Sequence, residues 1–125
     1  MSRTRRALGA EGEARAAAHL AGRGYRILGR NVRADGVEID VVAERAGLVV
    51  FVEVKARRSR AHGPPEAAVD ARKQARIARG AAAWLRAAPR RYRRARFDVI
   101  SCELDRDGRW RLTHWEGAFD AGCRG

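Results

Sequence analysis

The alternation of apolar and polar side chains changes its period several times along the chain. Residues 37–43 and 48–55 form two β-branched runs in which polar positions recur at every second residue, the pattern of β-strands. The short polar stretch between them ends in Ala46-Gly47, which is typical of a two-residue turn. These two runs predict a β-hairpin in the first half of the chain.

Two other segments have the three-to-four-residue period of a helix. The first covers residues 8–21, is rich in alanine, and ends at the glycine pair of residues 22–24. The second covers residues 71–85, where Asp70 can serve as the N-cap and Pro89 stops the helix. We therefore predict two helices, one on each side of the hairpin in the sequence.

Three further apolar runs complete the pattern. A strand is predicted at residues 25–32, and residues 34–36 form the turn that joins it to the hairpin. Residues 96–102 and 110–115 predict two more strands, with Asp107-Gly108 as the turn between them. The order is α-β-β-β-α-β-β. A helix that crosses over between two strands makes a mixed sheet flanked by helices the expected α/β architecture.

Composition and charge narrow the class of protein. The chain has 27 basic and 15 acidic residues, a net charge of +12, which favours a polyanionic partner and above all nucleic acid. Cys102 and Cys123 form no disulfide framework or metal motif, so a reducing cytoplasm is expected. No apolar run is long enough for a membrane span. Residues 1–125 are predicted to form a single domain, with residues 1–6 as a loose basic arm and 120–125 as a loose tail.

The hairpin brings acidic residues together. With Ala46-Gly47 as the loop, counting back places Asp40 directly opposite Glu53, with Cβ atoms roughly 5 Å apart. Lys55 lies on the same strand face as Glu53. Two facing carboxylates repel each other unless a cation lies between them, so we predict a divalent-metal site with a lysine at its edge. Glu38 is predicted to face Lys55, and two interpretations stay open for it, an ion pair with Lys55 or a direct metal ligand.

Lysine is rare in this chain. Only Lys55 and Lys73 are lysines, and the other 25 basic residues are arginines. Lysine carries a compact charge whose pKa can shift, a property that active sites use. We interpret Lys55 as functional, whereas Lys73 lies on the second helix among other charged residues.

Both predicted helices direct a polar residue to their packed side. Glu13 shares a helical face with Ala17 and Leu20, and Gln74 lies on the apolar stripe of the second helix. Oxygen ligands without nearby cysteine or histidine select Mg²⁺ or Mn²⁺. A metal held by few carboxylates keeps sites for water and substrate phosphate, which is suited to hydrolysis of a phosphodiester.

Arginines surround this predicted site. Residues 57–65 are expected to form a mobile basic loop, and Arg90 to Arg94 form a basic cluster that is either a nucleic-acid contact or a loop. Asp98 is expected to pair with an arginine. The candidates for nucleic-acid binding are Arg57, Arg58, Arg72, Lys73 and Arg76.

The spread of Glu13, Asp40, Glu53-Val54-Lys55 and Gln74 resembles the PD-(D/E)XK nuclease superfamily, which has an αβββαβ core. More narrowly, several motifs resemble the YraN-like family of bacterial proteins, regarded as endonucleases similar to archaeal Holliday junction resolvases. These motifs are Gly12-Glu13, Gly24-Tyr25, Arg30-Asn31, Glu38-Ile39-Asp40, Phe51-Val52-Glu53-Val54-Lys55, Lys73-Gln74 and Arg96-Phe97-Asp98-Val99. The resemblance covers about residues 9–119 and implies a restriction-endonuclease-like fold.

The resemblance also implies roles for single residues. Asp40 and Glu53 would be metal ligands with the Val54 carbonyl as a third, and Lys55 would be the catalytic lysine. Glu13 would complete the metal shell through water, and Gln74 would contact the site or the substrate. The chain departs from the superfamily in having Ile39 where proline usually precedes the aspartate.

These observations favour a Mg²⁺- or Mn²⁺-dependent endonuclease acting on DNA, including branched or processed DNA. Two alternatives stay open: a nucleic-acid-binding accessory protein without turnover on the same fold, and an RNA-directed nuclease or binder. A resolvase-like reaction cuts two strands symmetrically, which makes a homodimer one candidate assembly.

Overall fold

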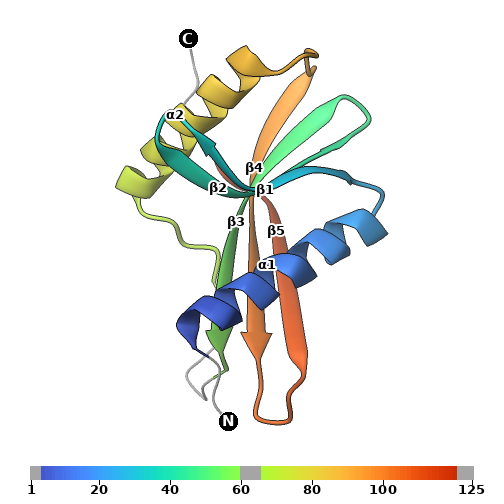
Figure 1. Cartoon of the computed structure of the whole chain (residues 1–125), viewed down its shortest axis with the longest axis vertical. Coiled ribbons are helices and arrows are strands. Elements are labelled where there is room, and N and C mark those ends of the chain that lie inside the picture. Colours follow the sequence, from blue (N-terminus) through green and yellow to red (C-terminus); the bar gives the residue numbers. More distant parts are fainter. Residues whose placement is uncertain (1–3, 60–65, 121–125) are drawn as a thin grey trace.

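The computed structural model describes residues 4–59 and 66–120. Two helices and five strands lie within these ranges, in the predicted order α-β-β-β-α-β-β (Figure 1). They are α1 (Arg5–Gly22), β1 (Arg26–Ala34), β2 (Val37–Arg45), β3 (Leu48–Arg58), α2 (Ala71–Ala87), β4 (Arg94–Leu104) and β5 (Trp110–Phe119).

The five strands form one twisted sheet in the order β1-β2-β3-β4-β5. Only β3 and β4 are parallel, because α2 carries the chain back to the start of the next strand in the same direction, whereas short turns join the antiparallel pairs. The predicted mixed sheet with helices is therefore confirmed, and the arrangement is consistent with a restriction-endonuclease-like α/β fold.

Strand alternation places the two helices on opposite faces of the sheet. Val50 and Val52 of β3 pack in one apolar cluster with Leu20 of α1. Val49 and Phe51, which alternate with them along the strand, point to the other face of the sheet. They pack in a second cluster that includes residues of α2. The core thus has two halves, one on each side of the sheet, and β3 contributes buried side chains to both.

Two of the three predicted turns have the backbone that a two-residue hairpin needs. Ala46 and Gly47 have φ of 51° and 80°, and the turn of Asp35-Gly36 also has positive φ at both residues. The predicted pairing of Arg45 with Leu48 is confirmed. It fixes the register of β2 and β3, and therefore the relative positions of the acidic residues further along.

Several predicted boundaries were wrong. Thr4 caps α1 by accepting a hydrogen bond from the Ala7 N–H at 3.0 Å, so Arg5 and Arg6 belong to the helix and not to a loose arm. Pairing with β4 extends β3 through Arg58, so Arg57 and Arg58 are strand residues, not loop residues. Residues 1–3, residues 60–65 of the predicted basic loop, and residues 121–125 of the predicted tail lie outside the described ranges.

α1 approaches the sheet closely at Gly12. A Cβ atom on Gly12 would lie 2.6 Å from the Cβ atom of Ala56, so only glycine allows this distance between helix and strand. The next residue along the helix is Glu13, which this contact brings towards β2 and β3. Among the described residues, neither helix combines the length and the apolar content that crossing a membrane requires.

Candidate functional site

The predicted acidic pair lies where β2 and β3 cease to pair. The ladder runs from Arg45 opposite Leu48 to Val41 opposite Val52, and Asp40 and Glu53 are the next residues of the two strands. Beyond this point, the Asp40 side chain takes the place of a backbone acceptor, since its Oδ2 accepts a hydrogen bond from the Val54 N–H at 2.8 Å.

This hydrogen bond also indicates the direction of the Val54 carbonyl. In an extended strand, the N–H and C=O of one residue lie on the same edge of the strand. The Val54 carbonyl therefore lies on the edge of β3 that borders Asp40. This carbonyl is the one that the resemblance implies as a third metal ligand.

The Asp40 carboxyl group is electrostatically unfavourable in its charged form. Burial, the neighbouring Glu53 carboxylate and the charge of Glu13 together raise its pKa to about 7. The Val54 N–H and the ammonium of Lys73 act in the opposite direction but do not offset these effects. Near neutral pH, this site is thus partly protonated, and a cation close to Asp40 would stabilise the carboxylate.

A lysine does lie against the acidic pair, but it is Lys73 of α2. The Lys73 ammonium forms an ion pair with the Glu53 carboxylate, whose side chain is only 11% exposed. The hydrogen bond to Glu53 raises the pKa of Lys73 against the effect of its own burial. Lys73 was predicted as a nucleic-acid contact, and the structure places it within the carboxylate site.

Lys55 lies on the same strand face as Glu53, yet its ammonium donates a hydrogen bond to the Ala68 carbonyl. Gln74 makes a similar contact, donating from Nε2 to the Val69 carbonyl at 2.7 Å. Both side chains therefore hold the segment that enters α2. Asp70 then caps the helix by accepting from the Lys73 N–H at 2.8 Å.

The remaining acidic candidates occupy different positions. Glu13 is half-buried on α1, and its effect on the pKa of Asp40 places its charge close to the pair. The predicted pairing of Glu38 with Lys55 is wrong. Glu38 is exposed and forms an ion pair with Arg33 at 3.7 Å, because these two residues face each other across β1 and β2.

The predicted nucleic-acid contacts fall into two groups. Arg57 binds the Glu103 carboxylate through two nitrogen atoms, each at 2.7 Å, so part of its charge is already neutralised. Arg58 is exposed at the end of β3. Arg72 and Arg76 are exposed on α2, and the charge of Arg76 lowers the pKa of Lys73, which shows that Arg76 lies near the site.

The donor set fits a hard divalent cation. Within residues 4–59 and 66–120, no group of three or more His, Cys, Asp or Glu side chains is placed to hold a metal ion. The chain can offer two carboxylates, Asp40 and Glu53, and the Val54 carbonyl. Mg²⁺ is commonly held by one or two carboxylates and completes its shell with water and substrate oxygen, so this small oxygen set suits Mg²⁺ or Mn²⁺.

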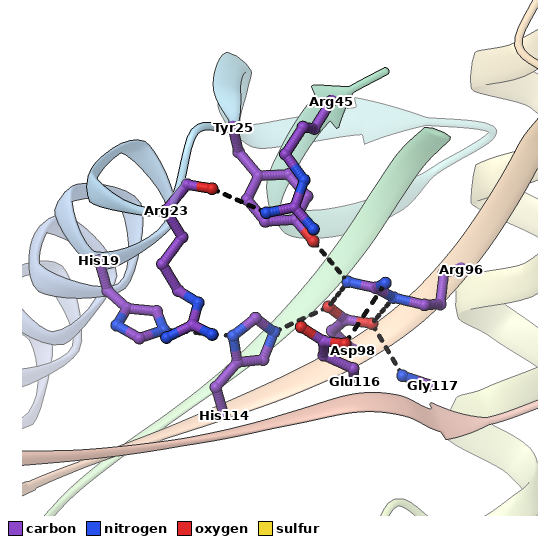
Figure 2. Close-up of polar contacts among 9 residues, drawn as sticks. All are labelled: His19, Arg23, Tyr25, Arg45, Arg96, Asp98, His114, Glu116 and Gly117. Carbon is purple, nitrogen blue, oxygen red and sulfur yellow. Dashed lines mark hydrogen bonds and ion pairs between the residues drawn. The ribbon is translucent and has the colours of Figure 1, made fainter. Parts of the chain in front are cut away.

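A second polar cluster lies on the α1 side of the sheet, around Asp98 (Figure 2). Asp98 is fully buried and accepts from Arg96 at 2.8 and 2.9 Å and from the Gly117 N–H at 3.0 Å. His114 Nε2 lies 2.8 Å from Asp98, and His114 Nδ1 lies 3.2 Å from Nε2 of His19. The predicted pairing of Asp98 with an arginine is confirmed.

This cluster has the geometry of a structural anchor. The hydrogen bonds from His114 and Arg96 lower the pKa of Asp98 despite its burial, so the carboxylate stays charged. The Gly117 bond holds an irregularity in β5, and Arg96 also bonds the Tyr25 hydroxyl at 2.8 Å. Sequence reasoning missed the two histidines, because they are 95 residues apart and no local spacing relates them.

A family model and individual relatives both relate this chain to the same protein family. The sequence profile of the Uncharacterised protein family UPF0102 matches residues 12–102. A UPF0102 protein of Trichlorobacter lovleyi is 47% identical over 115 residues, covering 91% of both chains. A UPF0102 protein of Symbiobacterium thermophilum is 46% identical, covering 93% of this chain and 98% of its own. Another, of Moorella thermoacetica, is 48% identical, covering 87% and 91%.

Proposed function

This chain belongs to the UPF0102 family, and we propose that it is a metal-dependent endonuclease that hydrolyses phosphodiester bonds in DNA. The observation that carries the proposal is the meeting of Asp40 and Glu53 at the end of the β2–β3 ladder. The raised pKa of Asp40 supports it, because a stable fold without a use for this arrangement would gain by replacing one of the two acids.

Asp40, Glu53 and the Val54 carbonyl would hold Mg²⁺ or Mn²⁺. When bound, the ion would polarise a phosphoryl oxygen and lower the pKa of an attacking water molecule. Glu13, whose charge acts on Asp40, would accept a hydrogen bond from a water molecule of the metal shell. Release of the Asp40 proton would accompany binding, so the affinity for metal should increase as the pH rises through 7.

The two lysines have different tasks in this proposal. Lys55 would leave the Ala68 carbonyl when substrate arrives and would stabilise the negative charge that develops on the scissile phosphate. Lys73 holds the Glu53 carboxylate in place through their ion pair. Gln74 keeps the start of α2 against the site through its bond to Val69 and would contact substrate from there.

Positive charge beside these residues supports a polyanionic substrate. Arg58, Arg72 and Arg76 are exposed, and the Arg57 side chain stays 52% exposed beside Glu103. Substrate binding through such contacts is electrostatic and insensitive to base sequence. Such binding suits a nuclease that acts on branched or processed DNA, and a homodimer that cuts two strands symmetrically is part of the same proposal.

One observation favours a second candidate, a nucleic-acid-binding accessory protein without turnover. Lys55 is bonded to the Ala68 carbonyl, and Lys73 already provides a counter-ion to Glu53. A site with these two contacts can be stable without metal. The accessory protein would bind DNA with the same arginines but would leave it intact.

Incubation with DNA tests the proposal. Linear, nicked, flapped and four-way-junction DNA, with a matched RNA duplex, should be mixed with purified protein in EDTA, Mg²⁺ or Mn²⁺. We expect cleavage of DNA only with metal, and a loss of roughly 10²-fold or more in the Lys55→Arg variant. That variant keeps the charge but not the compact ammonium. Binding without cleavage in every condition would refute the endonuclease and favour the accessory protein, while cleavage of RNA alone would favour an RNA nuclease.

A further inference from the structure

Charge is divided unevenly along the chain. Residues 71–97 contain nine arginines, one lysine and no acidic residue, a net charge of +10. The other 98 residues contain 17 basic and 15 acidic residues, a net charge of only +2. Arginine-biased coding would add arginine throughout the chain but would not remove every Asp and Glu from one segment. The excess positive charge therefore belongs to α2 and the loop that follows it.

Along α2, the arginines are confined to one side. Positions 72, 76, 79 and 86 are spaced by four, three and seven residues, which places them within about 80° of arc at 100° per residue. The buried residues Ile77 and Ala81 lie on the opposite side, against the sheet. We call this surface the arginine stripe, defined as Arg72, Arg76, Arg79 and Arg86, all of which are exposed.

Most of the basic residues in this segment lack an acidic partner. Four of the ten form ion pairs: Lys73 with Glu53, Arg79 with Asp35, Arg90 with Glu44, and Arg96 with Asp98. The other six form no ion pair with any residue that the structure describes; they are Arg72, Arg76, Arg86, Arg91, Arg93 and Arg94. Like charges at this density repel one another, so an external anion would stabilise the surface.

The stripe ends in a hollow at the C-terminal end of α2. An open cavity of about 670 Å³ is lined there by Leu85, Arg86, Ala88, Arg90, Arg91 and Tyr92. Arg90 lies 3.5 Å from the Glu44 carboxylate and shares it with Arg26, whereas Arg86 and Arg91 form no ion pair with a described residue. The sequence left the Arg90 to Arg94 cluster open between a contact and a loop, and the structure places Arg90 and Arg91 of this cluster at the hollow where the stripe ends.

The other end of the stripe is at the candidate site. Arg72 precedes Lys73, whose ammonium contacts Glu53. From Arg72 to Arg86, the helix rises about 21 Å at 1.5 Å per residue. A duplex advances about 3.4 Å per base pair, so this length corresponds to roughly six base pairs.

We propose that the arginine stripe and the hollow bind the phosphate backbone of a nucleic-acid duplex, over about six base pairs on one side of the candidate site. The inference rests on the proposed function for the position of the cleaved bond. A duplex fits better than a single strand, because the stripe contains no aromatic side chain on which bases could stack, and Tyr92 in the hollow is half-buried with its ring packed beside Trp84. Contacts to phosphates do not distinguish one base from another. The affinity for the duplex should therefore depend on salt concentration and not on base sequence.

Two double variants with equal loss of charge test this surface. Arg86→Ala/Arg91→Ala removes charge at the hollow, and Arg106→Ala/Arg109→Ala removes the same charge from exposed positions beside the β4–β5 turn. Binding to a labelled 20-base-pair duplex and to a matched single strand should be measured by fluorescence anisotropy in EDTA, over a range of salt. For the duplex, we expect the log–log salt slope to fall by about 1.8 in the first variant, at 0.9 per phosphate contact, and little in the control.

The outcomes separate this inference from the endonuclease. The inference would be overturned if both variants lost salt slope and duplex affinity equally, or if Arg86→Ala/Arg91→Ala lost neither. Tighter binding of the single strand than of the duplex would also overturn it. Duplex binding that weakens only in the first variant supports it even if no condition gives cleavage, a result that would refute the endonuclease alone. A wild-type protein that binds neither the duplex nor the single strand would overturn both this inference and the nucleic-acid part of the proposed function.

Discussion

Replacing Asp40 by asparagine should stabilise the metal-free protein at neutral and alkaline pH. Asparagine has nearly the same shape and keeps an oxygen that can accept the Val54 N–H, but it cannot carry the charge that Glu53 and burial oppose. The substitution therefore removes the electrostatic cost of Asp40 while keeping its hydrogen bond.

The pKa of Asp40 gives the magnitude. It rises from 3.8 to about 7, and each pKa unit corresponds to about 1.36 kcal/mol, so the cost of the charged form is at most about 4 kcal/mol. Asp40 is only partly buried, and discounting for solvent screening leaves about 2 kcal/mol. For a domain of this size, that corresponds to roughly 8 °C in Tm.

The sign of the pH dependence follows from the same shift. Because the folded protein binds the Asp40 proton more tightly than the unfolded chain, this group favours folding most below pH 3.8. Its contribution to the free energy of unfolding falls as the pH rises from about 4 to about 7 and is constant above about 8. Wild type and Asp40→Asn should therefore have similar stability near pH 4 and should diverge towards pH 8.

Urea denaturation in EDTA at several pH values between 4 and 8.5 measures this difference. Asp107→Asn is a matched control, because it makes the same chemical change at an exposed turn position that forms no ion pair with a described residue. Addition of Mg²⁺ or Mn²⁺ at pH 8 should stabilise the wild type by about 1–3 kcal/mol and should not stabilise Asp40→Asn. If wild type and Asp40→Asn follow parallel curves with pH, Asp40 carries no strained charge and the argument for a cation there is wrong.

Two further predictions concern the fold. Gly12→Ala should destabilise the protein by about 1–3 kcal/mol in urea, because its Cβ would overlap Ala56, whereas Gly9→Ala in the same helix meets no atom within 4 Å and should stabilise by about 0.5–1 kcal/mol; equal effects would contradict the close approach of α1. Asp98→Asn should cost about 3 kcal/mol, since it leaves the buried donors around it without a charged acceptor, and a loss below 1 kcal/mol would contradict the anchoring role of His114 and its neighbours.

Local patterns were sufficient to predict much of the fold. The Ala46-Gly47 turn and strand alternation fixed the pairing of Arg45 with Leu48, and with it the approach of Asp40 to Glu53. These features depend on neighbouring residues in one hairpin, where turn length determines register.

Contacts that depend on the crossover between β3 and β4 could not be predicted in this way. Strand alternation predicted which face of the sheet Lys55 occupies. Its hydrogen-bond partner, the Ala68 carbonyl, depends on how the segment before α2 runs past β3. The pairing of Arg57 with Glu103 depends on the parallel register, which no turn specifies. The same holds for Lys73, which the crossover helix carries back to Glu53.

Cleavage by two matched glutamate variants tests the central claim most directly. Glu53→Gln removes a proposed metal ligand, whereas Glu103→Gln removes a carboxylate of the neighbouring strand, with the same exposure of 11% and its own ion pair to a basic residue. Cleavage should be measured with Mn²⁺ on the DNA that wild type cuts fastest, using protein purified in parallel. We predict that Glu53→Gln loses cleavage by at least about 10²-fold while Glu103→Gln keeps most of it. Equal activity of the two variants would contradict a metal-dependent nuclease site at Asp40 and Glu53.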